Sequence, residues 1–376
     1  MNWKFWQKKK EGEPHKKKSA AREWFDAIVF AVVAATLIRW IFMEAFTIPT
    51  PSMENSLLMG DYLFVSKFHY GARTPKTPLQ LPLTHQYIWG THIPAYLDWI
   101  QLPQYRLPGF SSVKNNDVVV FNYPADKGFP TDLKTNYIKR CMGIAGDTLQ
   151  IIDRQVFING KPALNPPEMQ YNYRVYTKDP FPERIFRKYK IPNYASANGY
   201  FKKDFDMIAK GKTGYFIDLS QGKLERMLND RIADSIRMVD HKGLEMGLFP
   251  HNIKYQWDVD NYGPLWIPKE GATIKLDSSN IAIYESTIAN YEGWESVVAK
   301  GDRLVIDGKE ITEYTFKQNY YFMMGDNRHN SADSRYWGFV PADHIVGKAF
   351  MIWLSVDAEG GFSDKIRWRR IFNMVK

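Results

Sequence analysis

Two hydroxyl side chains lie among prolines in the segment Ile48-Pro49-Thr50-Pro51-Ser52-Met53. Pro51 fixes its own φ angle and biases Thr50 towards an extended conformation. We therefore expect a rigid corner that presents the hydroxyls of Thr50 and Ser52. Such a corner suits a nucleophile beside an oxyanion donor, provided that a base takes the serine proton. Taken alone, the segment is more typical of a linker between a membrane segment and a domain.

A lysine in an apolar run is the candidate base. In Tyr137–Met142, period-two alternation places Tyr137, Lys139 and Cys141 on one face of an expected strand. An amine among apolar neighbours has a lowered pKa, which would let Lys139 act as a neutral base. Taken alone, a lysine in a strand is more often solvated. Cys141 is interpreted as a small buried residue and not as a nucleophile.

A third polar segment, Gly325–Arg335, is dense in Asp, Asn, Arg and Ser and lies between two strand-like runs. By itself it is typical of a surface loop. Asp333 and Arg335 are two residues apart, so a direct ion pair between them needs a turn and not a straight helix.

These three segments, in this order behind an apolar segment of membrane length, resemble those of type I signal peptidases (leader peptidases), which are bacterial serine–lysine membrane endopeptidases. The resemblance covers residues 44–72, 113–165 and 318–357. It implies that Ser52 is the nucleophile and Lys139 the general base. It also implies an oxyanion hole formed by the Ser52 backbone N–H and the Thr50 hydroxyl.

The same resemblance implies a set of supporting residues, which are Tyr137, Ser331, Asp333 and Arg335. Ser331 is expected to orient the base lysine, and Asp333 to pair with Arg335. The sequence departs from the family at His329, where an aspartate is usual. Relatives in the endoplasmic reticulum use a histidine as the base, but we expect Lys139 to keep that role here.

The resemblance implies a membrane-bound serine endopeptidase that removes N-terminal signal peptides from exported preproteins. Small residues would be preferred at two positions before the cut. The expected partners are signal peptides and the lipid bilayer, with no nucleic acid, no cofactor and no metal. One alternative is a non-catalytic, membrane-tethered binding or assembly protein on the same fold. The other is a Ser–Lys self-cleaving regulator, which would be expected to carry a DNA-binding motif.

The positioning elements begin with an apolar segment, residues 24–43, that is long enough to span a bilayer as a helix. Residues 1–23 hold eight Lys or Arg against three Glu and so supply +5 of the net charge of +9. A basic flank stays in the cytoplasm, so we expect a single-pass protein of the inner membrane with its later residues outside. A cleaved signal peptide and a buried soluble helix are the alternatives.

Beyond residue 60 the pattern favours antiparallel β structure. Short β-branched or aromatic runs are bounded by Gly, Asn, Asp and Pro, and they predict strands at 62–65, 117–121, 137–142, 148–152, 155–158, 303–306, 320–324 and 350–354. Asn159-Gly160 is a hairpin-turn signal. The single cysteine excludes an internal disulfide. We therefore expect a mainly β fold, an antiparallel catalytic sheet with a large inserted second domain.

We expect five parts. A basic cytoplasmic segment (1–23) is followed by a transmembrane helix (24–43) and by a catalytic β domain in two pieces (44–164 and 301–357). Between the two pieces lies an inserted domain (165–300), and a basic amphipathic tail (358–376) follows. Within the insertion, helical spacing predicts a helix over Ser220–Met238. The tail is expected to be a short helix, lying either at the membrane interface or on the protein surface. We expect the insertion to be dispensable for the chemistry.

Overall fold

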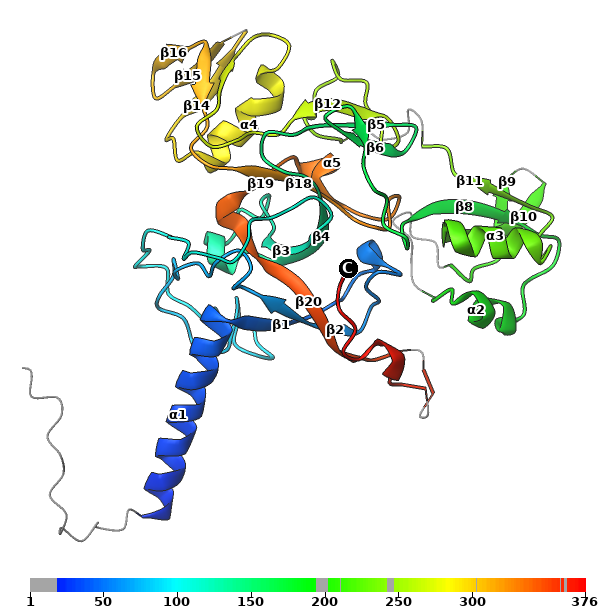
Figure 1. The fold of residues 1–376 in the computed structure, drawn as a ribbon, viewed down its shortest axis with the longest axis horizontal. Helices are drawn as coiled ribbons and strands as arrows, with labels where there is room; N and C mark the ends of the chain where they lie inside the picture. The colour runs from blue at the N-terminus through cyan, green and yellow to red at the C-terminus, as the bar shows by residue number, and fades with distance from the viewer. Residues whose placement is uncertain are drawn as a thin grey trace, which may run out of the picture.

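The computed structural model describes residues 19–193, 202–209, 211–241, 247–301, 303–358, 360–361 and 364–376. Antiparallel β-sheets dominate it, and one long N-terminal helix projects away from them (Figure 1). The mainly β, antiparallel class predicted from the sequence is confirmed.

A seven-stranded antiparallel sheet, here called the central sheet, has the strand order β1-β2-β20-β3-β4-β18-β19. Its strands are β1 (Met43–Thr47), β2 (Asp61–Ser66), β3 (Val118–Asn122), β4 (Asn136–Gly143), β18 (Tyr320–Met324), β19 (Val340–Pro341) and β20 (Ile345–Ser355). Neighbouring side chains of β3 enter different clusters, since Val118 packs with Met53 whereas Val119 packs with Cys141. This period of two lets the central sheet bury apolar side chains on both faces.

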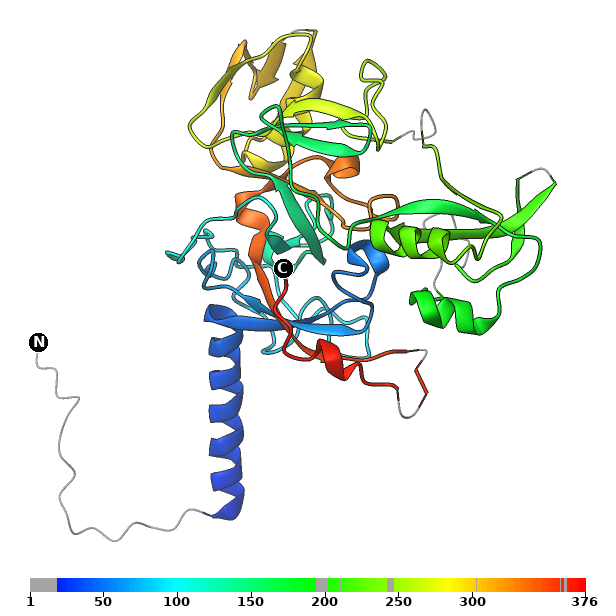
Figure 2. The same ribbon diagram turned by 45° about the vertical axis from the view of Figure 1, so that its right-hand side comes forward.

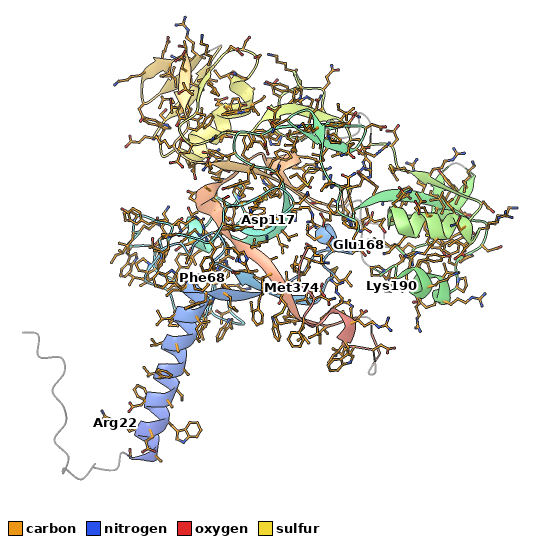
Figure 3. All side chains as sticks on the ribbon, in the orientation of Figure 1. Arg22, Phe68, Asp117, Glu168, Lys190 and Met374 are labelled. Carbon is orange, nitrogen blue, oxygen red and sulfur yellow. The ribbon has the colours of Figure 1, made fainter. Side chains whose placement is uncertain are left out.

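Helix α1 (Ala20–Ile41) has no buried residue, and by length and composition it is able to cross a membrane. Figures 1 and 2 show it as a stalk below the sheets, and Figure 3 shows its side chains projecting without cover from other elements. The helix ends two residues before the expected Met43. Met43 instead pairs with Ser66 in the central sheet, so strand pairing ends the helix.

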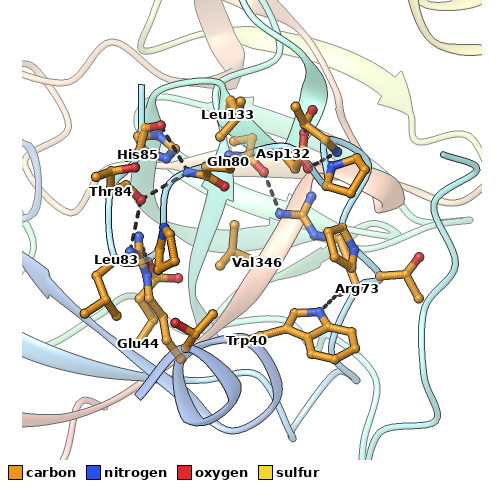
Figure 4. Close-up of a pocket in the computed structure, with 18 of the residues that line it drawn as sticks. Trp40, Glu44, Arg73, Gln80, Leu83, Thr84, His85, Asp132, Leu133 and Val346 are labelled. Atoms are coloured by element: carbon orange, nitrogen blue, oxygen red, sulfur yellow. Dashed lines mark hydrogen bonds and ion pairs between the residues drawn. The ribbon is translucent and has the colours of Figure 1, made fainter. Parts of the chain in front are cut away.

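The C-terminal end of α1 is fixed to the body beside a cavity of about 330 Å³ (Figure 4). Arg39 donates from Nε to Glu44 Oε1 over 2.6 Å and from Nη1 to Thr84 O over 3.0 Å. Trp40 donates its indole N–H to Arg73 O over 2.7 Å. These bonds join the end of the helix directly to β1 and to the loop before β3, so the sheets are attached firmly to the helix.

A second sheet, here called the inserted sheet, has the order β11-β8-β10-β9. Its strands are β8 (Gln170–Tyr176), β9 (Asp206–Ala209), β10 (Lys212–Ser220) and β11 (Ser235–Met238), and the helices α2 (Glu183–Tyr189) and α3 (Gln221–Asn229) accompany it. Tyr173, Val175, Phe186 and Met227 belong to its separate apolar cluster. Figures 1 and 2 show this unit to one side of the central sheet.

The remaining strands form small sheets around one large apolar cluster. They are β5 (Thr148–Ile152), β6 (Gln155–Ile158), β7 (Lys161–Pro162), β12 (Tyr262–Trp266), β13 (Thr273–Lys275), β14 (Val297–Lys300), β15 (Arg303–Ile306), β16 (Lys309–Ile311) and β17 (Glu313–Thr315), with the helix α4 (Ile281–Tyr291). Asn159 and Gly160 link β6 to β7 with φ of 52° and 76°, which confirms the predicted hairpin turn.

Strand pairing crosses the expected limits of residues 165–300. Tyr262 of β12 pairs with Ile151 of β5, and Val297 of β14 pairs with Ile306 of β15. The stretch therefore shares sheets with the segments on either side of it. The expected division into domains stays a prediction.

The helix predicted over Ser220–Met238 is wrong in its second half. Helix α3 stops at Asn229, Arg231 has a φ of 49°, and Ile236 lies in β11 opposite Val175. A pattern with an apolar residue every three or four positions is compatible with one long helix, but also with a short helix followed by a strand. The free edge of β8 favours the strand, because residues 235–238 pair with it as β11.

The tail does not form the expected helix. Within the described residues of the tail, the only helical turn is the 3₁₀ turn η4 (Trp368–Arg370), and Val375 N–H donates to Phe350 O over 2.9 Å. Arg370 forms an ion pair of 2.6 Å with the buried Asp61. The basic residues of the tail thus serve to attach an extended segment to the central sheet.

Candidate active site

Ser52 lies at the centre of a 3₁₀ turn, η1 (Pro51–Met53), that follows β1. Thr50 before it is extended, with φ −129° and ψ 155°, as expected for a residue that precedes a proline. Met53 after it is completely buried, which anchors the turn, and Ser52 itself is 7% exposed. The proline corner predicted from the sequence is present, but the serine is less exposed than expected.

Lys139 lies in β4 beside this turn. Its Nζ donates to Ser52 Oγ over 2.8 Å and to Ile138 O over 3.0 Å, although 87 residues separate the lysine and the serine. The central sheet holds Lys139 in place, because β4 lies between β3 and β18 and Lys139 pairs with Val119. The structure therefore brings the two predicted catalytic side chains into direct contact.

Burial changes the acidity of this lysine. Lys139 is 4% exposed, and burial lowers its pKa to about 8, while Asp333 and Asp326 oppose the shift more weakly. At pH 7 about a tenth of the amine would then be neutral, against well under one per cent at the ordinary pKa of about 10.4. A neutral amine in contact with a hydroxyl has the geometry that a general base needs.

The Thr50 hydroxyl lies 3.5 Å from Ser52 Oγ, at the limit of a hydrogen bond. Thr50 is exposed, so its hydroxyl is accessible to a bound carbonyl oxygen. Its expected role as an oxyanion donor, together with the Ser52 N–H, stays a prediction.

Gly325 is where the third segment meets the nucleophile turn. A Cβ atom at this position would lie 2.2 Å from Ser331 Oγ and 2.6 Å from Ser52 O, so only a glycine fits. Ser331 is thus brought to the site. Its side chain makes only a long bond of 3.5 Å to Ala332 O within the described residues, and its expected bond to Lys139 stays a prediction.

Asp333 and Arg335 form the expected ion pair, and both side chains are buried. Arg335 donates to the Asp333 carboxylate from Nε over 2.9 Å and from Nη2 over 2.8 Å. The turn needed for this spacing is the start of α5 (Ser334–Trp337), which Asp333 caps. Asp333 also accepts the Gly325 N–H over 3.0 Å, so the pair fixes the glycine beside Ser52.

Tyr137 lies in the apolar surroundings of the lysine amine. Its ring stacks on Tyr123 with the centroids 4.5 Å apart, and Lys139 Nζ lies 5.3 Å from the Tyr137 centroid. The side chain therefore forms part of the apolar wall near the amine.

Sequence reasoning missed a second buried ion pair beneath the site. Arg140 donates to Asp326 from Nε over 2.8 Å and from Nη2 over 2.7 Å, and Ser56 donates to the same carboxylate over 2.5 Å. Arg140 follows Lys139 and Asp326 follows Gly325, so the pair joins the neighbours of two site residues. Their opposite charges were visible in the sequence, but their proximity depends on the pairing of β4 with β18.

His329 is turned away from the serine. Its Nε2 donates to Asp260 Oδ1 over 2.8 Å, and its Nδ1 accepts the Asn172 N–H over 3.3 Å. Burial lowers the pKa of His329, more than Asp260 raises it. Both nitrogens are occupied by other partners, which supports Lys139 as the base.

Comparison with known proteins shows to which family the chain is similar. The model of the family described as signal peptidase, peptidase S26, matches residues 21–224 and 289–354. A signal peptidase I of Buchnera aphidicola subsp. Acyrthosiphon pisum (strain APS) is 27% identical over 344 residues, which cover 90% of this chain and 77% of the relative. A signal peptidase I of Rickettsia massiliae (strain Mtu5) is 33% identical over 144 residues, 38% of this chain and 45% of the relative.

The two matched segments contain the serine turn, the lysine strand and the Gly325–Arg335 loop. They also cover well over half of the chain. The chain therefore belongs to the signal peptidase, peptidase S26, family.

Proposed function

We propose that this protein is a membrane-bound serine endopeptidase that removes N-terminal signal peptides from exported preproteins, with Ser52 as the nucleophile and Lys139 as the general base. The observation that carries the proposal is the 2.8 Å contact between a buried lysine amine and the serine hydroxyl. Family membership and the relatives named signal peptidase I support the substrate class.

The neutral Lys139 amine takes the Ser52 proton as Oγ attacks the carbonyl carbon of the scissile peptide bond. The Ser52 N–H and the Thr50 hydroxyl donate to the oxyanion that forms. The Lys139 ammonium then gives its proton to the departing amine, which leaves an ester on Ser52. Water attacks this ester with Lys139 again as the base, and the signal peptide is released with a free carboxyl end.

The expected topology completes the proposal. Helix α1 crosses the inner membrane once, with residues 1–23 in the cytoplasm and the sheets on the outer side, close to the bilayer. The bonds of Arg39 and Trp40 hold the body against the end of α1, so Ser52 stays near the surface where a translocated signal peptide emerges.

The direct test is incubation of the detergent-solubilised full chain with a preprotein, followed by sequencing of the new amino terminus. The wild type should cut after the signal peptide, and Ser52→Ala should not. Cleavage that persists in Ser52→Ala contradicts the assignment of the nucleophile. A wild type that cleaves no preprotein contradicts the function.

A further inference from the structure

The carbonyl of Pro51 accepts two hydrogen bonds, one within its own turn and one from a side chain of another segment. Pro51 O accepts the Glu54 N–H over 3.0 Å and the Asn327 side-chain amide over 3.3 Å. This carbonyl and the Ser52 N–H belong to one planar peptide group, and in a trans peptide they point in opposite directions. Whatever fixes the Pro51 carbonyl therefore also aims the Ser52 N–H.

Asn327 contacts the nucleophile turn twice. Its backbone N–H donates to Ser52 O over 3.1 Å, and its Nδ2 donates to Pro51 O. The same Nδ2 donates to Asp218 Oδ2 over 3.0 Å. Since both partners of the side chain are acceptors, the amide nitrogen and not its oxygen must face them. The orientation of Asn327 is thus determined by the Asp218 carboxylate on one side and the turn on the other.

Asp218 comes from β10 of the inserted sheet and is 2% exposed. Its carboxylate accepts Asn172 Nδ2 over 3.0 Å and Lys202 Nζ over 2.9 Å. Burial alone raises the pKa of Asp218, but Lys202 and the amide donors outweigh burial and hold that pKa below its usual value. The group that fixes Asn327 is therefore a stable anion.

Lys202, in the turn before β9, provides a second link to the nucleophile turn. Its Nζ lies 2.7 Å from Glu54 Oε2, and Gln170 Nε2 donates to the same oxygen over 2.6 Å. Glu54 is the residue whose N–H holds Pro51 O. Both donors to that carbonyl are thus fixed by buried charges, Asp218 of β10 and Lys202 of the turn before β9.

We propose that Asn327 and Asp218 are positioning residues for the oxyanion hole. Asp218 fixes the Asn327 amide, which holds the Pro51 carbonyl and so points the Ser52 N–H at the substrate carbonyl oxygen. Hydrogen bonds accepted by an amide carbonyl also polarise its N–H, which strengthens the donor. The inference rests on the proposed function, and it gives the inserted sheet a part in the chemistry.

The test is a double-mutant cycle in the solubilised full chain, with Asn327→Ala, Asp218→Ala and the double variant. Asp230→Ala is the matched control, because Asp230 forms its ion pair with Lys188 on the surface of the same unit. Steady-state kinetics on a short peptide substrate give kcat and KM. The midpoint of the rise in rate with pH reports on Lys139.

We expect Asn327→Ala to lower kcat about 10- to 100-fold, with KM changed less than about threefold, since a transition-state interaction is lost. Asp218→Ala should act in the same way. Because Asp218 acts through Asn327, the double variant should be no slower than Asn327→Ala alone. The control and the pH midpoint should not change.

A kcat of Asn327→Ala close to that of the wild type contradicts the proposal. Losses that multiply in the double variant, or that appear only in KM, contradict it as well. If Asp218→Ala does not fold, Asp218→Asn replaces it. A single amide oxygen must then serve the four donors that the carboxylate now binds, so a smaller loss of the same pattern is expected. These outcomes are separate from the proposed function, which fails only if the wild type does not cleave or Ser52→Ala does.

Discussion

At the scale of single residues, the free-energy cost of burying Lys139 is what would let it act as the proposed base. A shift of its pKa from about 10.4 to about 8 corresponds to roughly 3 kcal/mol against the charged form. The neighbouring carboxylates, Asp333 and Asp326, are each bound to an arginine, so they oppose the shift only weakly. The two buried ion pairs thus keep the amine free of a counter-ion while they fix the loop beside it.

Removal of this amine should stabilise the fold in a pH-dependent way. Between about pH 8 and 10.4 the unfolded chain holds more protons at Lys139 than the folded chain, so wild-type stability rises with pH there. Lys139→Met should therefore be inactive, but more stable than the wild type at pH 6.5 by up to about 3 kcal/mol. Its advantage should shrink at pH 9.5.

Chemical unfolding in detergent at the two pH values measures this difference. Lys161→Met, which changes an exposed lysine in β7, is the control and should show little effect. An advantage of Lys139→Met that is equal at both pH values contradicts the buried-charge explanation.

At the scale of elements, the site is made where three segments distant in sequence converge on one sheet. The turn η1 follows β1, Lys139 lies within β4, and Gly325 follows β18. The contact between η1 and the Gly325 loop is too close for any side chain at Gly325. Backbone approach, and not only side-chain chemistry, therefore positions Ser52.

Gly325→Ala tests this close approach. The new Cβ would overlap Ser331 and the Ser52 carbonyl, so the turn or the loop must move, and a displacement near 1 Å costs about 100-fold in rate. We expect at least that loss of kcat in a folded protein. Gly222→Ala in α3, where nothing lies within 4 Å of the new Cβ, should keep full activity.

If the Gly325→Ala enzyme keeps the wild-type kcat, the turn tolerates the shift, and this contradicts the claim that the backbone at Gly325 positions Ser52. Circular dichroism and the thermal midpoint of each variant establish that it is folded.

Local patterns predicted five of the seven strands of the central sheet, because runs such as Tyr62–Val65 or Tyr320–Met324 carry their β signal within five residues. They did not predict β1 or β19, which are defined by pairing with β2 and β18. They also predicted the proline corner, whereas the Asp333–Arg335 pair was implied by the resemblance to signal peptidases. They did not predict the Arg140–Asp326 pair or the contact of Asp218 with Asn327, which depend on the order of strands in different sheets. The helix expected over Ser220–Met238 failed for the same reason, since pairing with β8 outweighed local spacing.

At the scale of the whole molecule, α1 and the inserted sheet both contact the central sheet or its loops, α1 at one end and the inserted sheet at its side. Figures 1 and 2 show α1 projecting by itself from the body, and the inserted sheet beside the central sheet. We expected residues 165–300 to be dispensable, but they supply β12, Asp260 beside His329, and Asp218 beside Asn327. We now expect their deletion to weaken the site and the fold together.

The topology has a direct test. Protease added outside spheroplasts should degrade the sheets and spare about the first 20 residues, because a basic flank is retained in the cytoplasm. Antibodies against a tag before residue 20 would detect the short protected fragment. A body that is protected until the membrane is permeabilised contradicts the orientation.

The central claim is that the neutral amine of Lys139 activates Ser52, and the pH dependence of single-turnover acylation on a peptide substrate tests it most directly. In the wild type and in His329→Ala, the rate should rise about tenfold per pH unit and level off near pH 8, as the amine loses its proton. Lys139→Arg should show no such rise and little activity, because a guanidinium stays protonated. Substantial activity in Lys139→Arg, or loss of the rise in His329→Ala, would contradict the account.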